Sequence, residues 1–209
     1  MMIHAYDPLY LAKASRTIGN MLHDAVRIFG MDGSDFLKKF IRSGIAKQFE
    51  TGNPKYISGK SGLELFLDVM EDTGESFGSK PIRSYERSDV YWVGWILAHY
   101  QWYSGRSFDK ILRVVPYEKL LKLYPTLHEA DIQKSYETID LYFSNAQSDL
   151  KIMRKSRGLT QEALAEAAGV SVHAIRAYER KTKPLNKARF DTVMRLAKVL
   201  GCEASDLIQ

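Results

Sequence analysis

Residues whose types could do chemistry are few in the first two thirds of the chain. Gly59-Lys60-Ser61 suggests a phosphate-binding loop, but such a loop needs a glycine at the position that Pro54 occupies. We therefore interpret Ser61 as a helix cap. The five histidines show no paired metal-ligand spacing, and Cys202 is the only cysteine. The sequence predicts no metal site, no cofactor and no catalytic residue set.

Positive charge is concentrated near the C-terminus. Residues 146–209 contain 12 Lys and Arg against 7 Asp and Glu, whereas residues 1–145 contain 18 of each. An excess of this kind is expected on a face that binds a polyanion. A solvated surface that happens to be basic is the alternative.

This basic segment also predicts two short helices joined by a glycine turn. Thr160 is expected to cap a helix over residues 161–168, and Gly169 to provide the left-handed turn that ends it. Ser171 is expected to cap a third helix, which runs to about residue 180 and buries Ile175 and Tyr178. Two such helices, the second with polar residues exposed, form a unit that fits into a DNA groove.

Residues 150–207 combine helix, turn and core residues at a specific spacing, and these are Arg154, Gly158, Gln161, Leu164, Ala165, Gly169, Val170, Ile175, Glu179, Leu196, Ala197, Leu200, Gly201 and Leu207. With this set the segment resembles the Xre family of helix-turn-helix proteins, which includes phage repressors and Cro. The resemblance implies a double-stranded DNA operator as partner. It implies that Gln161 binds a phosphate and steadies the third helix, and that Arg154 and Glu179 form an internal ion pair.

By the same resemblance, the exposed positions of the third helix face the major groove. They are Ser171, Val172, His173, Arg176 and Ala177. Val172 and Ala177 lack hydrogen-bonding groups, so direct readout is expected to rest on His173 and Arg176, with methyl contacts to thymine from the others.

The loop after Glu179 lacks the family's usual glycine and is longer and more basic than the common form. We expect it to lie along the phosphate backbone, and a solvated loop is the alternative. Its cations are Arg180, Lys181, Lys183 and Lys187.

The rest of the sequence predicts an all-α protein because helical periodicity dominates and alternating strand patterns are weak. A polar step over residues 144–148 divides an N-terminal helical domain, residues 1–145, from a C-terminal five-helix lambda-repressor-like domain, residues 146–209. Residues 73–87 are expected to form a loop. Helices are expected over residues 9–29, 36–41, 61–70, 89–103, 108–114, 117–123 and 129–143.

Single residues are expected to set several helix ends. Asp35 should begin the second helix, Ser88 should cap the aromatic one, and Pro125 should follow the end of another. Glu129, after His128, is expected to begin the last helix of the first domain.

The aromatic run over residues 91–103 is apolar almost all round. A helix of this kind must be buried on several sides, by its own domain or by a partner protein. The core interpretation is favoured, and a partner interface is the alternative. The aromatic residues of that interface would be Trp92, Trp95, Trp102 and Tyr103.

Residues 94–108 and 185–188 also resemble Firmicute-type Xre proteins suspected to be antitoxins of toxin–antitoxin modules. This resemblance implies an autorepressor whose first domain masks a cognate toxin. We expect a homodimer, because one recognition helix reads too few base pairs, and we expect no enzymatic activity. The alternatives are a stand-alone regulator whose first domain binds a ligand or dimerises, and an enzyme tethered to DNA. No signal peptide or membrane span is expected, so the cytoplasm is the predicted location.

Overall fold

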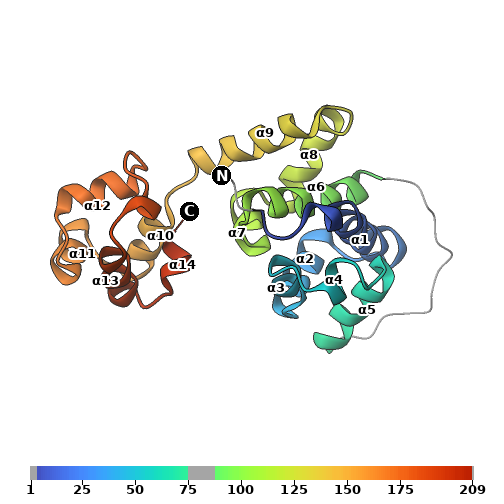
Figure 1. Ribbon diagram of the computed structural model, residues 1–209, viewed down its shortest axis with the longest axis horizontal. Helices are drawn as coiled ribbons and strands as arrows, with labels where there is room; N and C mark the ends of the chain where they lie inside the picture. Colours follow the sequence, from blue (N-terminus) through green and yellow to red (C-terminus); the bar gives the residue numbers. More distant parts are fainter. Residues whose placement is uncertain (1–3, 75–87, 209) are drawn as a thin grey trace. The chain divides into compact units, whose positions relative to one another are not determined.

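The computed structural model describes residues 4–74 and 88–208, which are helical with connecting turns and contain no strand (Figure 1). The predicted all-α fold class is confirmed. The chain divides into two compact units, Met1–Ser144 and Asn145–Gln209. Within the described ranges, no helix is both long and apolar enough to cross a membrane.

The first unit is a bundle built around one long aromatic helix. Its elements are η1 (Pro8–Tyr10), α1 (Leu11–His23), η2 (Asp24–Ile28), α2 (Gly33–Arg42), α3 (Ile45–Glu50), α4 (Pro54–Ile57), α5 (Gly62–Asp72), α6 (Asp89–Ser104), α7 (Phe108–Val114), α8 (Tyr117–Leu127) and α9 (Ile132–Asn145).

Helix α6 packs along α1 and also contacts α7 and α8, so it is buried on several sides as the sequence predicts. Two glycines permit the close approach of α1 and α6. A β-carbon on Gly94 would lie 2.6 Å from the carbonyl oxygen of Ile18, and one on Gly19 would lie 2.7 Å from the ring of Tyr91. A larger residue at Gly94 would have to push α6 away from the backbone of α1, whereas one at Gly19 would have to displace the Tyr91 ring.

Several predicted helix starts are confirmed by their hydrogen bonds. The Ser88 hydroxyl accepts from the Tyr91 N–H at 3.1 Å, which caps α6. Ser61 begins α5 through a capping box, in which its hydroxyl accepts from the Glu64 N–H and the Glu64 carboxylate accepts from the Ser61 N–H. Ser61 is therefore a cap, as the sequence indicates.

Other predicted boundaries are wrong. Asp32, not Asp35, caps α2, because its carboxylate accepts from the Asp35 N–H at 2.9 Å. Pro125 lies inside α8, whose last turn is kept in place by the buried Leu127. Glu129 does not begin α9, which starts at Ile132.

The single long helix expected over residues 9–29 is divided into η1, α1 and the π-helical turn η2. The short helices α3 and α4 were not predicted from periodicity, which is hard to detect over four to six residues. Most of the predicted loop over residues 73–87 lies outside the described residues.

The second unit has five α-helices and one short 3-10 turn: α10 (Asp149–Ser156), α11 (Gln161–Ala168), α12 (Val172–Glu179), η3 (Leu185–Lys187), α13 (Phe190–Leu200) and α14 (Ala204–Leu207). Figure 1 shows α11 and α12 as the adjacent orange helices of this unit. Leu164, Ile175 and Leu196 are fully buried in its own apolar core. Cys202 packs partly buried against that core, and burial raises the pKa of its thiol.

Candidate nucleic-acid interface

The α11–turn–α12 unit is fixed by local hydrogen bonds. The Thr160 hydroxyl accepts from the Ala163 N–H at 3.0 Å, and the Ser171 hydroxyl accepts from the Ala174 N–H at 3.2 Å. Gly169 ends α11 with a φ of 61°, a value that favours glycine. These residues confirm the predicted caps and turn, which fix where α12 begins.

A buried ion pair then ties α12 to α10. Arg154 Nε and Nη2 donate to the two carboxylate oxygens of Glu179 at 2.5 and 3.1 Å, and Nη1 donates to the Leu159 carbonyl at 2.6 Å. Gln161 Nε2 adds a third bond to Glu179 at 2.7 Å. Burial acts to raise the pKa of Glu179, but the hydrogen bonds from Arg154 and Gln161 outweigh it and lower the pKa. Glu179 is therefore held as a carboxylate that receives bonds from two helices.

The predicted base-contacting residues of α12 differ in exposure. His173 and Arg176 are exposed, whereas Val172 and Ala177 are half-buried. Ser171 is exposed, although its hydroxyl is already used as the cap of α12. The free protein therefore presents two hydrogen-bonding side chains at the start and middle of α12.

Arg176 already has partners within the domain, a feature that the sequence did not indicate. Its Nη2 donates to Glu162 Oε1 at 2.8 Å, and its Nε donates to Gln161 Oε1 at 3.4 Å. Both partners stand at the start of α11, and the ion pair is half exposed on each side. Pairing with Arg176 helps to lower the pKa of Glu162, after the hydrogen bond from its own backbone. A base in the groove would therefore compete with Glu162 and Gln161 for the Arg176 guanidinium.

The basic loop after α12 has an irregular but anchored backbone. Lys181 takes a left-handed φ of 58°, and the Lys183 N–H and the Thr182 hydroxyl both donate to the Ala177 carbonyl. Lys183 Nζ lies 5.6 Å from the centre of the Tyr178 ring, and Leu185 is buried. Three cationic residues of this loop are exposed, namely Arg180, Lys183 and Lys187.

The four aromatic residues of α6 that were predicted for a partner interface have two different surroundings. Trp102 Nε1 donates to the Tyr6 carbonyl at 2.7 Å, and Tyr103 stacks on Tyr136 with ring centres 4.1 Å apart. Trp92 and Trp95 instead line a cavity of the first unit with a volume near 620 Å³. The sequence indicated an unusual aromatic helix here but did not predict the cavity. It did not identify the lining residues that come from other helices, which include Arg16 and Tyr124.

Within the described part of the chain, no group of three or more His, Cys, Asp or Glu side chains is placed to hold a metal ion. Lys60, from the rejected phosphate-loop tripeptide, forms an ion pair with Asp68, and this hydrogen bond raises its pKa.

Comparison with known proteins agrees with the geometry of the second unit. Residues 150–207 match a family model described as helix-turn-helix. No curated protein and no solved structure matches the chain. Residues 150–207 thus form an Xre-like helix-turn-helix domain, the domain of a DNA-binding transcriptional regulator.

Proposed function

We propose that this protein is a sequence-specific transcriptional repressor that binds a two-fold operator in double-stranded DNA as a homodimer. The observation that carries the proposal is the exposed surface of α12, which is capped at Ser171 and held from behind by the Arg154–Glu179–Gln161 hydrogen bonds. A helix fixed in this way loses little conformational freedom when it enters the major groove.

Base readout is assigned to His173 and Arg176. An arginine can donate two hydrogen bonds to guanine O6 and N7, and in this protein that base would compete with Glu162 for Arg176. Half-buried Val172 and Ala177 fit methyl contacts to thymine. Gln161 and the cations Arg180, Lys181, Lys183 and Lys187 are assigned to phosphates, which set register and affinity but not sequence.

The homodimer follows from the size of the reading surface. One recognition helix contacts only a few base pairs, and two copies on half-sites about one helical turn apart supply the rest of the specificity. Sedimentation of the full chain with a selected operator should give two chains per duplex.

The test of the readout uses duplexes selected from a random pool. His173→Ala and Arg176→Ala should each weaken binding to the selected site by about 1 to 3 kcal/mol more than binding to random DNA. Lys183→Ala should weaken binding to both DNAs. It should also reduce the slope of the logarithm of the binding constant against the logarithm of the salt concentration by about 1. Lys198→Ala, an exposed lysine on α13, is the matched control. Equal losses on both DNAs for His173→Ala and Arg176→Ala would contradict the readout assignment.

For the first unit we propose the role of an antitoxin that masks a toxin, with the second unit repressing the shared promoter. The support is the resemblance over residues 94–108 and the partly exposed Trp95 on α6. The product of the adjacent gene should arrest growth, and co-expression of this chain should restore it. Purification of the native complex should recover that product, and recovery of this chain alone would contradict the antitoxin role.

A second candidate for the first unit is a ligand-responsive regulator. The cavity beside Trp92 and Trp95 favours it, because its volume near 620 Å³ lies within the range of small-molecule sites and its lining is mostly aromatic with a few polar groups. The toxin experiment separates the two candidates, since a ligand-responsive regulator needs no protein partner.

A further inference from the structure

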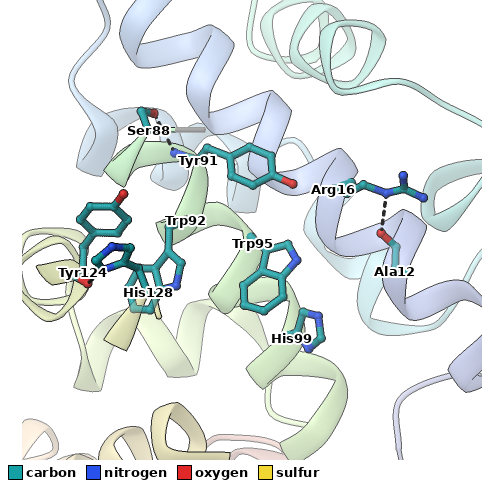
Figure 2. Close-up of a pocket in the computed structure, with 9 residues that line it drawn as sticks. All are labelled: Ala12, Arg16, Ser88, Tyr91, Trp92, Trp95, His99, Tyr124 and His128. Atoms are coloured by element: carbon teal, nitrogen blue, oxygen red, sulfur yellow. Dashed lines mark hydrogen bonds between the residues drawn. The ribbon is translucent and has the colours of Figure 1, made fainter. Parts of the chain in front are cut away.

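We infer that the cavity of the first unit is a binding site for a small aromatic carboxylate. Ala12 and Arg16 of α1 line one side, residues 91–99 of α6 line another, and Tyr124 of α8 and the following His128 line the end (Figure 2).

Ring faces and edges make up most of the lining. Trp92 meets Tyr124 edge to face with ring centres 5.8 Å apart, and Trp95 lies 4.1 Å from His99. Figure 2 shows the Trp95 and His99 rings next to each other, with Trp92 on the side of Tyr124 and His128. A planar aromatic ligand can meet such rings by offset stacking and edge contacts, which an alkyl chain cannot.

The charge of the lining residues indicates which charge the ligand carries. Of the described residues that line the cavity, Arg16 carries a fixed positive charge and none carries a carboxylate. Arg16 Nε donates to the Ala12 carbonyl at 3.0 Å, and its Nη1 and Nη2 meet no acceptor among the described residues. Two parallel donors of this kind match the two oxygens of a carboxylate. Glu129, which pairs with His128 Nε2 at 3.5 Å, is outside the lining and strongly exposed.

His99 supplies a neutral polar contact. Its Nδ1 lies 3.2 Å from the Tyr136 hydroxyl, and its Nε2 has no hydrogen-bond partner among the described residues. Burial lowers the pKa of His99 to about 4, so the ring is uncharged at neutral pH. The cavity therefore has the fixed positive charge of Arg16 at one end, and aromatic rings, including the uncharged ring of His99, over most of the rest of its lining.

Three probes with the same ring system test this site on the full chain: 2-naphthylacetate, its amide and 2-(2-naphthyl)ethylamine. In calorimetric titrations the acid should bind about tenfold more tightly than the amide, and the amine should bind most weakly. Octanoate, an acid without a ring, should bind more weakly than the naphthyl acid.

The NMR signals of the indole N–H groups of the three tryptophans show where the ligand binds. The acid should shift those of Trp92 and Trp95, whereas the signal of Trp102, which donates to the Tyr6 carbonyl, should stay in place. Arg16→Gln should reduce the affinity for the acid to that for the amide, and Ala12→Trp should fill the cavity and abolish both. Arg42→Gln, an exposed arginine at the end of α2, is the control and should change neither.

Equal affinities for acid and amide in the unmodified chain, equal affinity for octanoate, or shifts only at Trp102 would overturn the inference. These readouts do not involve DNA. A failure here therefore leaves the repressor proposal standing, and a failure to bind DNA leaves this site standing.

Discussion

Arg154 holds both carboxylate oxygens of Glu179, with nitrogen–oxygen distances of 2.5 and 3.1 Å, and both residues are buried. The pair joins α10 to the last residue of α12. The angle at which α12 is presented thus depends on a charge pair that lies behind it.

Removing one member of this pair should unfold the second unit locally. Arg154→Met leaves the Glu179 carboxylate buried without its main partner, at a cost of about 3 to 5 kcal/mol. Hydrogen–deuterium exchange over residues 150–207 should accelerate, and DNA binding should be lost.

The double variant Arg154→Met, Glu179→Met is the control for that prediction. It leaves no unpaired charge in the core, so it should recover much of the lost protection. Unchanged exchange in α12 of the single variant would show that the pair does not hold the helix.

Lys181 occupies a backbone conformation that suits glycine. Its φ of 58° disfavours a side chain, so Lys181→Gly should stabilise the second unit by about 0.5 to 1 kcal/mol in urea unfolding. Lys183→Gly is the control, because Lys183 is a lysine of the same loop without a positive φ, and it should give no gain. Equal effects of the two substitutions would refute strain at Lys181.

Gly94→Ala sets two effects against each other. Alanine favours a helix over glycine by about 1 kcal/mol, but its β-carbon would lie 2.6 Å from the Ile18 carbonyl oxygen across the α1–α6 crossing. Overpacking of this kind costs about 1 to 3 kcal/mol, so a net loss of stability is expected in thermal unfolding of the first unit. A raised melting temperature would show that the two helices can separate without cost.

His99 should make the first unit less stable in mild acid. Its pKa is about 4 when folded and about 6.5 when unfolded, so between these values the unfolded chain binds the extra proton and stability falls as the pH is lowered. The loss from pH 7 to pH 5 is at most about 2 kcal/mol. Urea unfolding of His99→Gln should show a smaller difference between these pH values, and an identical difference would contradict this assignment.

The helix-turn-helix could be predicted because its boundaries depend on interactions between residues close together in the sequence. Thr160, Gly169 and Ser171 act on backbone groups within three or four residues of themselves, so their types and order define the ends of α11 and the start of α12. Ser88 and Ser61 did the same in the first unit. The prediction that Asp35 begins the second helix was wrong because Asp32, one turn earlier, is an equally acceptable cap by type.

The sequence by itself determined the all-α class, the capped starts of α5, α6, α11 and α12, and that residues 150–207 form a helix-turn-helix module, because caps, turns and apolar periodicity depend on near neighbours. Tertiary structure alone decided that Arg176 pairs with Glu162, that Gly94 lies against α1, and that Trp92 and Trp95 face a cavity while Trp102 is hydrogen-bonded to Tyr6. Those outcomes depend on which side chains are brought together from helices far apart in the chain, and no local pattern contains that information.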